Sequence, residues 1–265
     1  MKSTSNHRFN KPVLAIFFIV LGMVCISIQD VLIKILSDTF PLHQIIFIRS
    51  VIAIAFSISI LHFQGGVMQL KTPHFKLHII RGLLLFIANT CFFCALVTMP
   101  LAEATTLFYI SPLLITFLSV IILGEKVGFR RILALVVGLF GVLLASWSNI
   151  HQNSDYSLDF TFILPLVAAL AYALMQVLTR HLGATAPAAV MAIYIQGILI
   201  IISFFFWMVL GDGRYSSELN NMSIEFLLRA WSFPKGNDGL LLLGCGLSSA
   251  IIGYSMAQAY RVSNP

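Results

Sequence analysis

The chain has 265 residues, of which 59% are hydrophobic and only 10% are charged, and its mean hydropathy is +0.95. Soluble domains carry roughly 25% charged residues, so this composition excludes an ordinary soluble domain and indicates lipid as the solvent. The net charge of +6 does not indicate a nucleic-acid partner, because the basic residues lie in short segments between apolar runs.

Apolar runs of about twenty residues recur along the chain, and a helix needs that length to cross ~30 Å of hydrocarbon. The first run contains Asp30 and Lys34 near its end, which fits a retained span better than a cleaved signal peptide. Eight spans are predicted, in chain order at residues 13–36, 42–63, 77–99, 101–123, 129–147, 160–180, 188–210 and 239–260. The sequence therefore predicts an all-α polytopic membrane protein.

The segment at residues 211–238 is too polar to span a membrane. Apolar residues recur in it at helical spacing behind Ser223, a possible helix cap, namely Ile224, Leu227, Leu228 and Trp231. Two interpretations stay open: a short helix on the outer membrane surface, and a loop folded over the protein.

Most of the 16 Lys and Arg residues fall on one side of the predicted spans if the N-terminus is cytoplasmic. Cytoplasmic loops are enriched in these residues, so we predict a cytoplasmic N-terminus in a bacterial inner membrane. All four cysteines lie within apolar runs, and the pair Cys91 and Cys94 indicates helix packing rather than redox chemistry. His74 and His78 have no third ligand near them in sequence, so we expect a solvated loop or helix start, with no metal or cofactor.

An internal repeat is visible when residues 29–36 (QDVLIKIL) are aligned with residues 175–182 (MQVLTRHL). The alignment pairs Asp30 with Gln176 and Lys34 with Arg180. A unit with an odd number of spans inverts its second copy across the membrane. The expected organisation is a cytoplasmic tail at 1–12, a first five-span repeat at 13–148, an external linker at 149–159 and a second repeat at 160–265. The second repeat holds three of its five expected spans.

Residues 95–114 (ALVTMPLAEATTLFYISPLL), residues 123–126 (LGEK) and residues 138–142 (GLFGV) resemble bacterial transporters of the drug/metabolite superfamily with EamA-type repeats. The resemblance implies ten helices in two inverted five-helix repeats, of which about eight are present here. It also implies transport of amino acids, vitamins, nucleotide-like or other metabolites. The charged set Asp30, Lys34 and Arg49 resembles the branch with S-adenosylmethionine and riboflavin uptake proteins.

Other readings of the whole chain stay open. The incomplete second repeat is also compatible with a truncated remnant that does not transport, and completion by a homodimer is a further hypothesis. A membrane enzyme is less favoured, because neither H-E-x-x-H nor G-x-S-x-G occurs. A channel is less favoured because the polar residues do not form repeated rings.

Ionisable side chains within membrane spans are costly, so they are candidates for the substrate pathway. Four of them are expected in the outer half of the membrane: Asp30, Lys34, Arg49 and Glu103. Arg49 or Lys34 would meet a carboxylate, and Asp30 or Glu103 would meet an amine or carry a coupling proton. The alternative is a structural ion-pair network, including an Asp30–Lys34 pair at i, i+4 spacing, with a snorkelling Lys34.

Uncharged polar residues complete the candidate pathway: Asn89, Gln196, and Gln176 as the counterpart of Asp30. Such side chains as often link helices to one another. Gly124 and Glu125 are expected to order a cytoplasmic loop through salt bridges with Lys126, Arg130 or Arg131. Small residues at four-residue spacing, such as Gly246 and Ala250, predict close helix approach.

Overall fold

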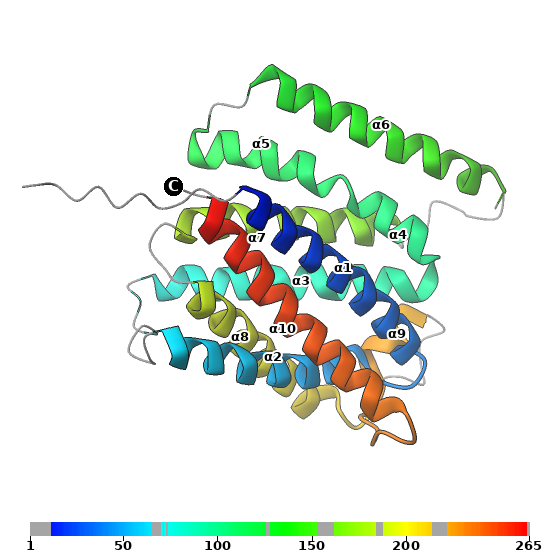
Figure 1. Cartoon of the computed structure of the whole chain (residues 1–265). Coiled ribbons are helices and arrows are strands. Elements are labelled where there is room, and N and C mark those ends of the chain that lie inside the picture. The colour runs from blue at the N-terminus through cyan, green and yellow to red at the C-terminus, as the bar shows by residue number, and fades with distance from the viewer. Residues whose placement is uncertain are drawn as a thin grey trace, which may run out of the picture.

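The computed structural model describes residues 12–64, 70, 72, 74–125, 128–152, 162–183, 188–213 and 222–263, and the regular structure within them is helical. Figure 1 shows the helices packed as one bundle, with the start of α1 and the last turns of α10 at one end and α9 at the other. The helices are α1 (Pro12–Leu36), α2 (Leu42–Gln64), α3 (Phe75–Thr98), α4 (Leu101–Phe108), α5 (Ser111–Leu123), α6 (Phe129–Gln152), α7 (Ile163–Gly183), α8 (Ala188–Leu210), α9 (Met222–Leu228) and α10 (Asp238–Ser263).

Seven segments of the described chain are long and apolar enough to cross a membrane, and all seven coincide with predicted spans. The remaining prediction falls on α6, whose described apolar stretch is Ile132–Gly141, so its crossing stays a prediction. The last turn of α6 reaches Gln152, within the expected linker at 149–159. Residues 153–159 and the expected tail at 1–11 lie outside the described residues.

The predicted fourth span consists of two helices, α4 and α5, with a turn at Tyr109 and Ile110. Pro112 stands at the start of α5. A proline in a helix has no N–H to donate and its ring clashes with the carbonyl four residues earlier, here that of Phe108. The proline therefore interrupts the span, although α4 and α5 together still form one apolar segment, Leu101–Leu123.

Large apolar side chains cover much of the outside of the bundle. Phe17, Phe117, Phe140 and Phe205 are each more than half exposed. Contiguous exposed apolar surface of this kind is unfavourable in water and typical of contact with lipid. The outside of the bundle is therefore the kind of surface that a membrane protein presents to lipid.

Three helix pairs make up the centre of the bundle: α1 packs on α10, α3 on α7, and α2 on α8. Two further contacts, between α2 and α10 and between α3 and α8, connect these pairs. At each of these two contacts a glycine meets an isoleucine, and a Cβ added to Gly246 or Gly82 would lie 2.7 Å from the Cβ of Ile52 or Ile198 respectively. The helices therefore approach too closely at these points for any side chain larger than hydrogen, as expected for Gly246.

The polar segment before α10 combines both expectations, because it contains a short helix and is folded over the protein. Ser223 in α9 donates a hydrogen bond to the Cys94 carbonyl of α3 at 2.7 Å, and Phe226 is fully buried. Beyond α9, the Gln44 amide donates to the Ser232 carbonyl and accepts from the Ser232 backbone N–H, at 2.6 and 3.1 Å. The segment therefore packs on the ends of α2 and α3.

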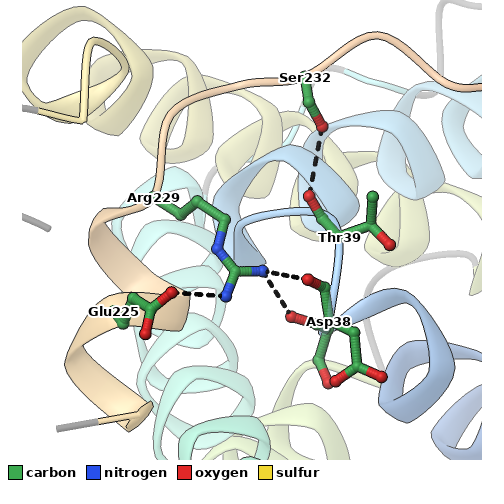
Figure 2. Close-up of polar contacts among 6 residues, drawn as sticks. Asp38, Thr39, Glu225, Arg229 and Ser232 are labelled. Carbon is green, nitrogen blue, oxygen red and sulfur yellow. Dashed lines mark hydrogen bonds and ion pairs between the residues drawn. The ribbon is translucent and has the colours of Figure 1, made fainter.

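Arg229 fastens this segment to the turn between α1 and α2 (Figure 2). One guanidinium nitrogen donates to the carbonyls of Ser37 and Asp38 at 3.0 and 2.7 Å, and the other pairs with Glu225 at 2.9 Å. The carbonyls at the end of α1 lack intrahelical donors, so a cation is a favourable partner there.

Replacing Arg229 by alanine is expected to destabilise the protein by about 1–3 kcal/mol, because two charged hydrogen bonds to backbone carbonyls are lost. Thermal unfolding of the purified protein in detergent measures the effect. Lys235→Ala, which removes an exposed cation from the same segment, is the matched control and should unfold like the wild type. Glu225→Gln should cost no more than ~0.5 kcal/mol, since the ion pair is partly exposed. An equal loss in Glu225→Gln would assign the effect to the ion pair instead.

Candidate functional site

Arg49 and Asp30 form the centre of the candidate site. Arg49 lies on α2 with 5% of its surface exposed, and its guanidinium carbon is 5.7 Å from the centre of the Phe93 ring on α3. Asp30 on α1 interacts electrostatically with Arg49, and Cys245 on α10 lies near the same guanidinium. Side chains from α1, α2, α3 and α10 thus surround one pair of opposite charges.

Neither charged group of this pair has a hydrogen bond or a direct ion pair among the residues that the structure describes. The expected structural pairing between Asp30 and Arg49 is therefore not a contact in this structure, although their charges interact. Buried charges without direct partners are costly within a membrane. Neither group is neutralised by direct contact with an opposite charge among the described residues.

A row of aromatic rings extends from the site to the second half of the chain. Phe93 contacts Phe92, Phe92 contacts Phe108 of α4, and Phe108 contacts Tyr172 of α7, with ring centres 5.5, 5.1 and 5.4 Å apart. The Gln176 amide donates to the Tyr172 hydroxyl at 2.7 Å. The row therefore connects Arg49, through its contact with Phe93, to Gln176, the proposed repeat counterpart of Asp30.

Lys34 has a different environment from the one expected for a solute contact. Its ammonium donates to the carbonyls of Leu96 and Met99, at 2.9 and 3.1 Å, where α3 ends. These carbonyls have no intrahelical donors and lie at the negative end of the helix dipole, which favours a cation. No pair with Asp30 is found among the described contacts, so the i, i+4 pairing is wrong for this structure.

Three other candidates lie on separate helices: Glu103 on α4, Asn89 on α3 and Gln196 on α8, each half-buried. The described contacts do not join any of them to Asp30 or Arg49. A role for these residues in the pathway stays a prediction.

Gln29 is a polar residue next to Asp30 that the sequence interpretation did not place in the site. It is 8% exposed, and its side-chain oxygen accepts a hydrogen bond from the Ser249 hydroxyl of α10 at 2.6 Å. The available signal was an amide within an apolar run directly beside a carboxylate. This hydrogen bond holds α1 against α10 beside the charged pair.

Gly124 ends α5 in the left-handed conformation, with φ of +67°, which glycine adopts without strain. The Glu125 carboxylate then pairs with Arg180 of α7 at 3.4 Å, and Arg180 also reaches the Ser119 hydroxyl at 3.4 Å. The expected partners were nearby in sequence, whereas the observed partner belongs to the second half of the chain. Glu125 therefore connects α5 to α7.

A second buried polar cluster lies between α3, α7 and α8, and it corrects the expectation of a solvated His78. His78 is 0% exposed and stacks on the Tyr194 ring with 4.4 Å between ring centres. Arg81 is 2% exposed and donates to the Thr179 hydroxyl at 3.0 Å. His78 lies in the first turns of α3, as expected for a helix start, but packing against α8 buries it.

Comparisons with known proteins agree with this membrane architecture. The model of the EamA-like transporter family matches residues 13–147. A riboflavin transporter of Vibrio cholerae is 27% identical over 84% of this chain and 67% of its own length. An S-adenosylmethionine uptake transporter of Rickettsia prowazekii is 22% identical over 93% and 75%, respectively. The pseudopaline exporter CntI of Pseudomonas aeruginosa is 29% identical over 61% and 57%.

A solved protein crystal structure superposes with a TM-score of 0.62 over 91% of this chain and 78% of its own, at 21% identity, which supports the fold. The family match covers half of the chain, and the named relatives are all transporters of small metabolites. The chain therefore belongs to the EamA-like transporter family and is a multi-pass membrane transporter of small metabolites.

Proposed function

We propose that the protein transports a zwitterionic metabolite across a bacterial inner membrane, by alternating access and as a secondary active transporter. The observation that supports the proposal is the pair of the half-buried Asp30 and the buried Arg49, which interact electrostatically and lack direct partners among the described residues. Arg49 would bind the anionic group of the solute and Asp30 its cationic group. The Phe93 ring beneath the guanidinium limits the motion of Arg49.

Alternating access is proposed because the helix pairs fit two inverted repeats, with domains at 13–148 and 160–265. Suppose that α1 corresponds to α7, α2 to α8 and α3 to α10. Exchanging the two repeats then turns the α1–α10 pair into the α7–α3 pair. The same exchange leaves the α2–α8 pair unchanged. All three pairs are in contact. Halves related in this way can rock about a central site.

The glycine contacts support the same correspondence. Ile52 and Ile198 are separated in sequence by the same offset as Asp30 and Gln176, and they meet Gly246 and Gly82 respectively. Exchanging the repeats therefore converts one glycine–isoleucine contact into the other. Such paired contacts follow directly from a duplicated unit.

The named relatives indicate which solutes to test first. S-Adenosylmethionine carries both an amino and a carboxylate group, which suits a site with one charge of each sign, whereas riboflavin lacks such a pair. We therefore expect purified protein in liposomes to take up labelled S-adenosylmethionine faster than riboflavin, with a rate that responds to an imposed proton gradient. Liposomes without protein are the control. The proposal would be contradicted if, for both solutes, the protein-containing liposomes took up label no faster than the protein-free liposomes, with or without the proton gradient.

A further inference from the structure

The cluster around Arg81 contains more hydrogen-bond donors than acceptors. Its guanidinium donates to the Thr179 hydroxyl at 3.0 Å and to the Nδ1 atom of His78 at 3.3 Å. Both partners are neutral in these contacts, and no carboxylate pairs with Arg81 among the described residues. A buried guanidinium is always charged, so the cluster holds a cation without a counter-ion.

The contact between these two side chains also determines the proton position on His78. A guanidinium can only donate, so Nδ1 of His78 must accept and its Nε2 must carry the proton. Nε2 is buried and has no hydrogen-bond partner. Nε2 lies on the other side of the ring from Nδ1, so its N–H points away from the guanidinium and His78 orients Arg81 without sharing a ligand with it. The guanidinium keeps N–H donors that the described contacts leave without an acceptor, and an oxygen with negative charge is the chemical group that satisfies such donors.

The cluster occupies the repeat counterpart of the outer site. Arg49 lies where α2 meets α1 and α10, and Arg81 lies where α3 meets α7 and α8. The proposed exchange of repeats converts the first junction into the second. With the N-terminus cytoplasmic, Arg49 lies in the outer half of the membrane and Arg81 in the inner half. Among the residues whose burial the structure describes, each half therefore contains one buried arginine.

Tyr194 covers the inner cluster in this structure. Its ring stacks on His78, and its hydroxyl donates to the Leu70 carbonyl of the segment between α2 and α3 at 2.6 Å. The Phe75 ring also contacts this tyrosine, with ring centres 5.9 Å apart. Movement of Tyr194 would uncover His78, the ring on which it stacks and which holds Arg81.

We propose that Arg81, held in place by Thr179 and His78, forms a second binding site, for a carboxylate or phosphate group, in the cytoplasmic half of the protein. In transport, the anionic group of the solute would leave Arg49 and arrive at this site. That role of the site rests on the proposed function. An anionic lipid headgroup would offer the same chemistry, so the test separates the two sources.

The test measures thermal unfolding in nanodiscs, which requires no transport and stands if the proposed solute is wrong. The background is Arg49→Gln, so that anions bound at the outer site do not contribute. In phosphatidylcholine nanodiscs, succinate or inorganic phosphate is expected to raise the unfolding temperature by about 3 °C relative to sodium chloride of equal ionic strength. Arg81→Gln, introduced into the Arg49→Gln background, should abolish this rise, whereas Arg81→Lys in the same background should retain part of it.

Thr179→Val is the milder variant, because it removes one partner of Arg81 without changing charge, and it should reduce the rise. An Arg81-dependent rise with either free anion identifies a site for soluble anions. A rise that requires phosphatidylglycerol in the nanodisc and again depends on Arg81 identifies a lipid headgroup as the ligand. No rise in any of these conditions, or a rise of equal size after Arg81→Gln, would overturn the proposal.

Discussion

Replacing Arg49 by glutamine is expected to reduce uptake, measured as kcat/KM, by about 100-fold. Arg49 is the buried cation of the proposed outer site, and removing one charge of a desolvated pair costs about 2–5 kcal/mol, where 1.4 kcal/mol corresponds to a factor of ten. Uptake of the solute identified in the liposome assay provides the measurement. Arg49→Lys retains the positive charge and should lose less activity than Arg49→Gln.

The double variant Asp30→Asn with Arg49→Gln distinguishes solute binding from a structural charge pair. If the two charges serve only to neutralise one another, removing both should restore much of the uptake lost by removing one. If each binds one end of the solute, the double variant should be at least as inactive as either single variant. Near-normal uptake by Arg49→Gln, or recovery in the double variant, would contradict the proposed site. Size-exclusion profiles check that each variant is folded.

Replacing Gly246 by leucine is expected to cause the largest loss of stability among single changes in α10. Even the Cβ of the new side chain would lie 2.7 Å from the Cβ of Ile52, so α10 must move away from α2. Overpacking of a tight interface costs about 1–3 kcal/mol. The neighbouring residue Cys245 interacts with Arg49, so the shift should also disturb the site and lower uptake.

Gly239→Leu is the matched control, since it lies on the same helix and a Cβ there would meet no atom within 4 Å. It should unfold at a temperature close to that of the wild type. Ile52→Ala creates space opposite Gly246, so it should recover part of the stability lost by the smaller change Gly246→Ala. The close-approach interpretation fails if Gly246→Leu and Gly239→Leu unfold alike.

The residues of the outer site were identifiable from sequence because each charge interrupts an apolar run. Asp30 and Arg49 are in the same region of the structure because their helices are adjacent in the chain and joined by a short turn. Gln29 was missed, since an amide has a weaker sequence signal than a charge. Its partner, Ser249, is far away in sequence, so only the packing of α10 on α1 brings the two together.

Lys34 and His78 show why sequence reasoning about single residues failed elsewhere. The spacing of Lys34 and Asp30 predicted a pair on one helix face, but the open carbonyls at the end of α3 provide better acceptors for the ammonium. His78 was expected in a solvated loop or helix start because no third ligand lies near it in sequence. Packing of α7 and α8 against that helix start buries it.

The sequence alone determined the class of the protein and the positions of its spans, because crossing hydrocarbon depends on the apolar length of each segment by itself. It also predicts a duplication, which is a property of the order of residues. Only the tertiary structure decided which side chains meet, since contacts such as Lys34 with Leu96 or Arg81 with Thr179 join residues far apart in the chain. The second buried arginine became a candidate site for that reason: its unused donors are visible only once three helices have packed around it.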